Sequence, residues 1–307
     1  MNEGTHHSHH PVDRVGLAAA LAAYGFWGLM PIYFKQLQTV SAGEIIAHRV
    51  LWAIPVLLVF LGLRDGRQVW RRLRLTGRQA GWLTVSGTLI AANWLLFVWA
   101  IVHGQVLATS LGYFINPLVS VLFGFLFLHE RLTALQKSAV GIAAVGTLYM
   151  ALFLGQPPWI SLALAFSFAT YGLVRKRLDV GPMTGLLWEN LLLGGPALGY
   201  MLWRARHGEM DFLSGPRHLD VLMMLAGLTT VLPLTWFNVA AQRLTLTLVG
   251  FIQYLAPSMS FMLAVFLWGE PFTRGHAITF LCIWTALVLV SLDSLRRRRA
   301  RRTAGLA

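Results

Sequence analysis

The residues LATSLGYFINPLVSVLFGFLFLHE, numbers 107–130, carry no charged side chain before His129. An apolar run of about 20 residues is long enough to cross the hydrocarbon core of a bilayer as a helix. Asn116 and Pro117 lie in the middle of this stretch, and Glu130 ends it. The stretch therefore predicts a membrane-spanning helix that contains a proline and closes on a glutamate.

The same design recurs in the second half of the chain, in TLVGFIQYLAPSMSFMLAVFLWGE, numbers 247–270. The spacing from Pro257 to Glu270 is identical to the spacing from Pro117 to Glu130. A proline and a glutamate at identical spacing indicate an internal repeat. We interpret the repeat as the mark of a membrane transporter that is built from two similar halves.

Composition agrees with a membrane protein. Of the 307 residues, 56% are apolar and 12% are charged, whereas a soluble domain carries roughly 25% charged residues. The net charge is +13, but arginines that flank apolar runs serve topology and contact with anionic lipid, so we expect no nucleic acid partner. The single cysteine, Cys282, excludes an internal disulfide framework and a cysteine-based zinc site.

The N-terminal tail up to Arg14 is polar, and Val15 opens an apolar run of full membrane-spanning length. We therefore expect no cleavable signal peptide. Four histidines in this tail have no acidic or cysteine neighbours that would complete a metal site, and we favour an unselective, disordered tail over a metal site. These histidines are His6, His7, His9 and His10.

Apolar runs of helical length are separated by charged gaps, and their continuous apolarity argues against strands, whose pattern would alternate. We predict an all-α integral membrane protein with ten transmembrane helices in two inverted repeats of five helices. The repeats are residues 15–154 and 158–293, between a polar tail, 1–14, and an arginine-rich tail, 294–307. The ten runs are 15–34, 44–63, 80–102, 107–128, 134–154, 158–176, 183–203, 219–240, 246–268 and 273–293.

Lysines and arginines predict the orientation. If the N-terminus faces the cytoplasm, the inside segments hold 19 of them and the outside segments hold 5. An excess of positive charge marks cytoplasmic loops, so both termini are expected inside. Because five is odd, the second half enters the membrane from the opposite side. Inverted halves of this kind can exchange conformations around one central site, which is the basis of alternating access.

An ionisable side chain inside a span costs roughly 2.5–3.5 kcal/mol on insertion scales and marks a functional candidate. Glu44, His48 and Arg49 lie in the second run, and Glu189 with Asn190 in the seventh. Counting depth along the helices places Arg49 and Glu189 about 13 Å apart along the membrane normal, which disfavours a direct pair. We predict that Arg49 lines an outer vestibule and Glu189 an inner one. The alternative is that each side chain snorkels towards the interface or pairs locally, for example Arg49 with Glu44.

Polar and aromatic residues gather at mid-depth between these charged groups. Each proline leaves the carbonyl four residues earlier, at Tyr113 or Gln253, without its helical hydrogen bond. Such carbonyls need a neighbouring helix, water or substrate as partner. We predict a cavity walled by Trp and Tyr that suits an amphipathic or aromatic solute, with plain helix packing as the alternative for each residue. The candidates are Asn93, Trp94, Trp99, Tyr113, Asn116, Trp236, Asn238, Gln253 and Tyr254.

Four residues are expected to have structural roles. Pro117 and Pro257 should break their helices. Glu130 and Glu270 should each cap the helix that follows them through backbone N–H groups, with a threonine nearby. Enzyme motifs for phosphate binding, zinc hydrolysis or a serine nucleophile are missing from the sequence, so we predict no enzyme activity and no cofactor.

Several motifs resemble a known family, the drug/metabolite transporter superfamily with EamA domains, and more closely its RarD branch. The resemblance covers residues 14–293 and implies a bacterial inner-membrane permease that exports small metabolites or drugs, with a family link to chloramphenicol sensitivity. The motifs are AYGFWGLMPIYFK at 23–35, EIIAHRV at 44–50, NWLLFVWA at 93–100, SLGYFINPL at 110–118, LAFSFATYGLVRK at 164–176 and GFIQYLAP at 250–257 with GE at 269–270.

Together these patterns predict a secondary transporter that moves a small organic solute across the bilayer by alternating access. Proton coupling through Glu189, His48 or Glu44 is left open, because burial in apolar surroundings raises the pKa of a carboxylate towards the working range. A homodimer is also left open. The alternatives are a regulatory or chaperone membrane protein without transport and, less favoured, an intramembrane enzyme, for which no nucleophile and base converge.

Overall fold

The computed structural model describes residues 13–66, 74–102, 106–154, 159–269 and 274–303, and all regular structure within them is helical. A helix satisfies every backbone polar group internally, as lipid requires. The elements are α1 (Arg14–Gln36), α2 (Ala42–Asp65), α4 (Gly77–Val102), α5 (Val106–Leu128), α6 (Ala134–Leu154), α7 (Trp159–Arg177), α8 (Pro182–Arg206), α9 (Arg217–Arg243), α10 (Leu246–Gln253), α11 (Leu255–Met262), the π-helical turn η2 (Leu263–Leu267) and α12 (Arg274–Thr303).

Within the described residues, eight helical segments are long and apolar enough to cross a membrane. Helices α7 and α8 are not among the eight. Polar residues explain this, because α7 ends on Arg175-Lys176-Arg177 and α8 carries Glu189-Asn190 within it. Helix α7 contacts α4, α5 and α9, and α8 contacts α2, α4 and α9. Neighbouring protein surrounds much of α7 and the first half of α8, whereas the second half of α8 keeps exposed apolar side chains such as Leu198 and Leu202.

The two prolines act differently on their helices. The ninth run divides at Tyr254, between α10 and α11, four residues after Gly250 and three before Pro257. Pro257 has no N–H to donate to the carbonyl of Gln253, so the break falls where the sequence predicts it. Pro117, in contrast, lies inside α5, which is continuous from Val106 to Leu128. The prediction of a broken helix is wrong for α5, because its flanking turns keep helical geometry.

The cap made by Glu130 also differs from expectation. His129 turns the chain with a φ of 54°, and the Glu130 N–H donates to the Gly124 carbonyl at 3.0 Å. This turn directs the Glu130 carboxylate to the start of α10, where it accepts from the N–H groups of Leu246 at 2.6 Å and Thr247 at 2.9 Å. It does not cap α6, the helix that follows it.

Helix α6 has its own cap. The Thr133 hydroxyl accepts from the Gln136 N–H at 3.1 Å, and the Gln136 side chain accepts from the Thr133 N–H at the same distance. This reciprocal arrangement is a capping box, and it satisfies two N–H groups that the first helical turn leaves open. The corresponding cap predicted for Glu270 lies outside the described residues.

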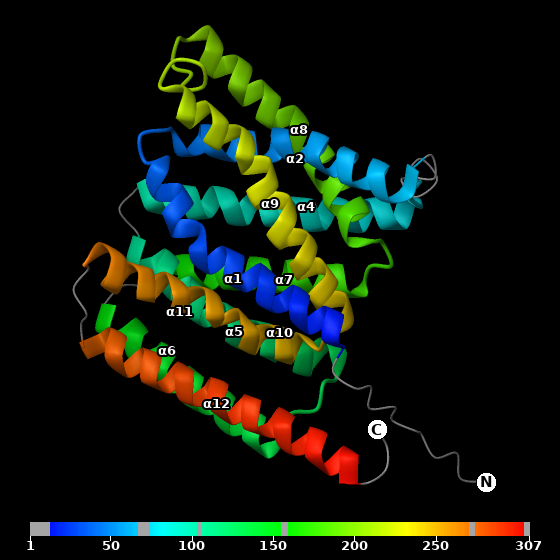
Figure 1. Ribbon diagram of the computed structural model, residues 1–307, viewed down its shortest axis with the longest axis vertical. Helices are drawn as coiled ribbons and strands as arrows, with labels where there is room; N and C mark the ends of the chain where they lie inside the picture. The colour runs from blue at the N-terminus through cyan, green and yellow to red at the C-terminus, as the bar shows by residue number, and fades with distance from the viewer. Residues whose placement is uncertain (1–12, 67–73, 103–105, 155–158, 270–273, 304–307) are drawn as a thin grey trace.

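One edge of the molecule is formed by α6 and α12, which lie side by side (Figure 1). Their backbones approach closely at Gly146, where an added Cβ would lie 2.7 Å from the Cβ of Cys282. The Thr279 hydroxyl donates to the Gly146 carbonyl at 3.2 Å across the same contact. Small residues at such contacts let membrane helices pack tightly. Helix α5 joins this pair to the rest of the bundle.

Glycines also lie at two helix crossings in the other part of the molecule. At Gly227 in α9, an added Cβ would overlap the Trp52 backbone of α2, and at Gly87 in α4 it would meet the Glu189 Cα of α8 at 3.5 Å. The interval from Gly87 to Gly227 equals the interval from Pro117 to Pro257. Two glycines at this interval therefore lie at helix crossings, one between α4 and α8 and the other between α2 and α9.

Charged groups tie the helices together at the two ends of the bundle. At one end, Arg243 binds the Asp13 carboxylate at 2.8 Å, and this hydrogen bond lowers the pKa of Asp13. Lys176 donates to the Ala241 carbonyl at 2.9 Å nearby.

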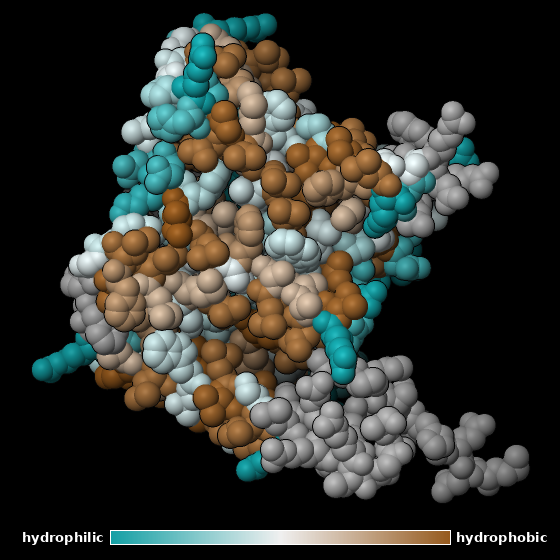
Figure 2. Space-filling model, in the orientation of Figure 1, coloured by the Kyte–Doolittle hydropathy of each residue, from teal (hydrophilic) through white to brown (hydrophobic). Residues whose placement is uncertain are grey.

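Between the ends, hydrophobic residues cover most of the face in Figure 2, and hydrophilic residues gather towards its margins. This distribution is the one expected of a surface that faces lipid between two aqueous layers.

Candidate functional site

Arg49 lies in the eighth position of α2 and reaches the centre of the bundle. Its Nε donates to the Thr230 hydroxyl at 3.0 Å, and Thr230 is the middle residue of α9, equally far from its two ends. Thr230 in turn donates to the Ala226 carbonyl at 2.8 Å, so its lone pairs are left for Arg49. The two Nη atoms have no hydrogen-bond partner among the described residues and keep accessible surface.

Aromatic residues from three other helices surround this guanidinium. The ring of Trp94, on α4, lies under it, with 4.4 Å between the Arg49 Cζ and the ring centroid. Tyr33 of α1 and Tyr113 of α5 lie close enough to interact with it electrostatically. Tyr113 is 49% exposed although Phe97 packs edge-on against it at 6.1 Å. Arg49, Trp94 and Tyr113, three sequence candidates, are thus brought together, with Thr230 and Tyr33 added.

The alternative of a local pair between Arg49 and Glu44 is wrong, because Glu44 is fully buried and has other partners. Its carboxylate accepts from Arg204 Nε at 3.0 Å and from the backbone N–H groups of Asp211 at 3.0 Å and Phe212 at 2.8 Å. These bonds fasten the loop between α8 and α9 to the start of α2. Glu44 is therefore engaged in holding this end of the bundle together.

His48 lies one turn further along α2, beside Glu44. Its Nδ1 accepts from the Trp52 indole N–H at 3.0 Å, and its Nε2 lies 3.9 Å from the Glu44 carboxylate. The imidazole also packs on Phe212 at 4.6 Å between ring centroids. Acceptance at Nδ1 places the proton of a neutral ring on Nε2, facing Glu44. His48 thus takes part, with Glu44, in the contact between the start of α2 and the loop between α8 and α9.

Glu189 joins four helices. Its carboxylate accepts from Ser86 of α4 at 2.5 Å and from the Tyr171 hydroxyl of α7 at 3.3 Å. The amide of Asn238, on α9, donates to the same Tyr171 oxygen at 3.1 Å. Glu189 itself is only 1% exposed, which differs from the predicted position on a vestibule wall. In this conformation it is the centre of a buried network, because hydroxyl groups and a cation replace water around it.

The cation is Arg175, whose Nη1 lies 3.6 Å from Glu189 Oε1. Arg175 is not among the candidates predicted from sequence, yet its side chain is fully buried. Its Nη2 donates to the Pro182 carbonyl at 3.0 Å, and its guanidinium occupies the space that a side chain on Gly185 would need. The sequence held one indication of this buried pair. Gly185 lies four residues before Glu189, so the two residues share a helix face.

An aromatic cluster lies next to this network, at the contact of α1, α7 and α9. Tyr171 stacks on Phe237 with ring centroids 5.9 Å apart, and Phe237 also packs against Trp27 and Phe168 at 6.0 and 5.1 Å. Tyr24 completes the cluster at 6.3 Å from Phe237. The cluster fills the middle of the bundle with rings and leaves the hydroxyl of Tyr171 for the polar network.

Gln253 and Tyr254 mark the break between α10 and α11. The Tyr24 hydroxyl donates to Gln253 Oε1 at 3.4 Å, and the Tyr254 hydroxyl donates to the carbonyl of Phe114 in α5 at 3.2 Å. Tyr254 is only 1% exposed. Both side chains therefore join the break to neighbouring helices, as the packing alternative predicts.

The remaining candidates are spread through the bundle. Asn93 donates to the Leu164 carbonyl and the Ser167 hydroxyl of α7, each at 2.9 Å. Trp99 packs against Trp159 at 5.8 Å near the end of α4. Trp236 packs edge-on against Phe26 at 6.0 Å, Asn190 donates to the Leu186 carbonyl at 2.8 Å, and Asn116 is buried in α5.

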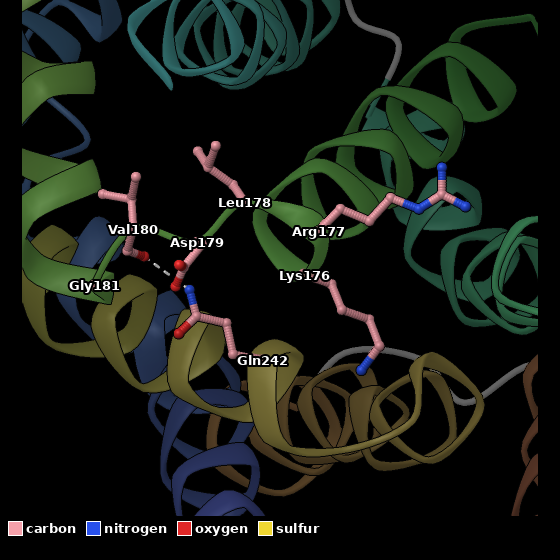
Figure 3. Close-up of a pocket in the computed structure, with 7 residues that line it drawn as sticks. All are labelled: Lys176, Arg177, Leu178, Asp179, Val180, Gly181 and Gln242. Atoms are coloured by element: carbon pink, nitrogen blue, oxygen red, sulfur yellow. Dashed lines mark hydrogen bonds between the residues drawn. The ribbon is translucent and has the colours of Figure 1, made fainter. Parts of the chain in front are cut away.

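A pocket of about 310 Å³ opens at the turn between α7 and α8, and none of the sequence candidates lines it. Figure 3 shows Gln242 reaching across it, where Nε2 donates to the Val180 carbonyl at 3.0 Å. Arg177 points away from it and donates to the Phe127 carbonyl. The polar groups here join α7, α9 and α5 at the bundle end, so this pocket is distinct from the interior around Arg49.

Within the described part of the chain, no three His, Cys, Asp or Glu side chains are grouped as a metal site would require. The histidines of the N-terminal tail lie outside the described residues. The features that distinguish the interior are instead two arginines, a buried carboxylate and many aromatic rings among apolar helices. A helical bundle of this kind, with eight segments fit to span a bilayer, is a multi-pass membrane protein with a polar interior.

The model of the EamA-like transporter family matches residues 14–152 and 158–292, and the chain belongs to this family, in the RarD branch of the drug/metabolite transporter superfamily. An uncharacterized transporter of Vibrio cholerae is 44% identical over 292 residues, which cover 94% of this chain and 96% of that one. Protein RarD of Streptomyces exfoliatus is 42% identical over 292 residues, covering 94% and 92%.

A crystal structure is similar in fold, with a TM-score of 0.70 over 91% of this chain and 98% of that one. At 16% identity, this similarity shows the fold alone. The family and the relatives make this protein a membrane transporter of the drug/metabolite type, for which a small solute and a lipid bilayer are the natural partners.

Proposed function

We propose that this protein is a secondary transporter that moves a small organic solute by alternating access. The observation that carries the proposal is the contrast between its two intramembrane arginines. Arg49 offers accessible Nη atoms at the middle of α9, whereas Arg175 is buried against Glu189. An interior in which Arg49 has donors without partners, while Arg175 and Glu189 are paired, suits a carrier that opens to one side of the membrane at a time.

The proposed architecture is two inverted repeats of five spans each, in which α7 and α8 also cross the membrane. The two family matches, 14–152 and 158–292, support a duplicated chain. Further support comes from the helix crossings at Gly87 and Gly227, which are separated by the repeat interval. His129 and Gly269, separated by the same interval, both adopt positive φ at the end of a proline-containing segment.

We place the protein in a bacterial inner membrane with both termini in the cytoplasm and export as the direction of transport. Charge supports this orientation, because arginines and lysines concentrate in the segments on the side of the termini. The start of α1 and the end of α12 lie at the same end of the bundle, which agrees with an even number of crossings (Figure 1).

Glu189 is the group that we propose for proton coupling. Its carboxylate accepts from Ser86 and Tyr171 and pairs with Arg175, so protonation would weaken the ties between α4, α7 and α8 together. Such a dependence of helix contacts on one proton is what coupling requires. Glu44, by comparison, already accepts one hydrogen bond from Arg204 of α8 and two from backbone N–H groups of the loop between α8 and α9.

Flux through sealed vesicles tests the proposal. Liposomes that contain the purified protein and are loaded with a panel of small metabolites should release at least one of them faster than protein-free liposomes loaded in the same way, in a saturable manner. Glu189→Gln should reduce the dependence of this flux on a pH gradient, and Arg206→Gln, at an exposed helix end, should not. Folded protein that moves none of the solutes would contradict transport and favour a regulatory role.

A further inference from the structure

Arg49 is an uncompensated positive charge in the interior of the bundle. No Asp or Glu among the described residues forms an ion pair with it, and the groups that interact with it electrostatically are the hydroxyls of Tyr33 and Tyr113. The other interior arginine, Arg175, has its carboxylate in Glu189. A charge in apolar surroundings is costly unless an opposite charge or water shares it.

The surroundings of Arg49 hold the guanidinium in one orientation. Its Nε is bound to Thr230, and its Cζ lies over the ring of Trp94. Because Nε is occupied, the groups left for a ligand are the two Nη atoms, which keep accessible surface. Two parallel N–H groups of this kind match the two oxygens of a carboxylate or the oxygens of a phosphate.

The aromatic residues define what can lie beside that anionic group. Trp94 and Tyr113 come from α4 and α5, and Phe97 packs against Tyr113. Tyr113 is half exposed, and it lies close enough to the Arg49 guanidinium to interact with it electrostatically. A planar apolar body would find ring surfaces there, while bare inorganic anions would leave those surfaces uncovered.

We propose that Arg49 is the anion-binding residue of the transport site, and that the solute is a small organic acid with a planar or aromatic body. This inference rests on the proposed transport function and names the class of its substrate. The acid group would receive the two Nη donors of Arg49, and the body would lie against Trp94 and Tyr113. Thr230 acts as a positioning residue, because it binds Arg49 and not the solute.

Matched pairs of acids and amides test the charge requirement directly. Phenylacetate with phenylacetamide, benzoate with benzamide, and indole-3-acetate with indole-3-acetamide differ in charge but little in shape. A concentration series of each with the purified full chain, followed by its thermal unfolding midpoint, yields an apparent Kd. We expect at least one acid to bind about 10-fold or more tightly than its amide, as charge-assisted hydrogen bonds allow.

Variants decide whether Arg49 is responsible. Arg49→Gln should abolish the preference for the acid. Arg49→Lys keeps the charge but loses the two parallel N–H donors, so it should retain part of the preference. Arg206→Gln, which removes a positive charge at the exposed end of α8, should keep the full preference. Equal binding of acid and amide by the wild type, or a preference that survives in Arg49→Gln, would overturn the proposal.

The same variants in the flux assay separate this proposal from the transport function. Loss of acid preference in Arg49→Gln without any flux in the wild type would uphold the anion site and contradict transport. Flux of a neutral solute that is unchanged in Arg49→Gln would uphold transport and contradict the anion site. Elution of each variant as a single species in gel filtration, with wild-type helicity, establishes that the comparison is made on folded protein.

Discussion

At the scale of single residues, Arg49 and Arg175 show how neighbours decide what an intramembrane charge does. Arg175 is fully buried, pairs with Glu189 at 3.6 Å and donates to the Pro182 carbonyl, so its charge is used inside the protein. Arg49 is held by a neutral hydroxyl and an indole ring, which leave its Nη atoms available. The same side chain is therefore structural at one position and offered to a ligand at the other.

Gly185 makes room for the buried Arg175, and this predicts a strong effect of a small substitution. Gly185→Ala places a Cβ where the guanidinium lies, and Arg175 cannot move without losing Glu189 and the Pro182 carbonyl. We expect unfolding free energy to fall by about 1–3 kcal/mol, as for overpacked interiors. Denaturant unfolding in detergent micelles measures the change.

Gly195 provides the matched control in the same helix. An added Cβ there meets nothing within 4 Å, so Gly195→Ala should leave stability unchanged or raise it slightly, because alanine favours helix over glycine. Equal stability of the two variants would show that Arg175 is free to relocate. It would then contradict the tight packing described for the Glu189 network.

At the scale of elements, helix ends in one half of the chain are completed by residues of the other. The first three N–H groups of α10 all have partners, two from the Glu130 carboxylate and one from the Thr245 hydroxyl at 3.2 Å. A carboxylate at a helix N-terminus also interacts favourably with the helix dipole. Glu130 thus joins the end of α5 to the start of α10, two elements that pack against each other.

This cap predicts that Glu130→Ala destabilises the protein although Glu130 touches no proposed site residue. Two N–H groups of α10 would lose their partner, at a cost of about 1–2 kcal/mol, as for helix caps elsewhere. Glu209→Ala is the control, since Glu209 is 53% exposed and lies 3.8 Å from Arg204, and it should change stability by less than about 0.5 kcal/mol. Urea unfolding of both variants compares them, and an equal loss would argue against the cap.

At the scale of the whole molecule, the ends of the helices fall into two groups. Arg243 with Asp13, and Lys176 with Ala241, join the start of α1 and the ends of α7 and α9 at one end. At the other end, Glu44 fastens the start of α2 to the loop after α8. The proposed topology assigns the first group to the cytoplasm and the second to the outside.

Cysteine labelling tests this assignment. In a Cys282→Ala background, Ser214→Cys in the exposed loop between α8 and α9 should react with an impermeant maleimide in intact cells. Thr76→Cys, exposed just before α4, should react only after the membrane is permeabilised. The reverse pattern would invert the topology, and labelling of both positions from outside would contradict an odd number of crossings between them.

Most of the helices could be predicted from the sequence, because lipid requires each membrane-spanning segment to form its own backbone hydrogen bonds. As far as the structure describes them, the predicted runs lie in helical structure apart from the break at Tyr254. Pro257 breaks its helix where its missing N–H requires it. The candidate site was accessible only in part. Arg49, Trp94 and Tyr113 were predicted as separate candidates, but their grouping with Thr230 and Tyr33 was not.

The sequence by itself determined the place of the apolar helices, the spacing shared by the two prolines and their glutamates, and the family. Only the tertiary structure decided the partners of the charges: Glu130 caps α10 in place of α6, Arg175 pairs with Glu189, and Glu44 holds a loop and leaves Arg49 without a carboxylate. The physical reason is that helix formation in lipid depends on neighbours a few residues apart along the chain. The partner of a charged side chain depends on which helices pack together, and the two residues can lie far apart in the sequence, as Glu130 and Leu246 do.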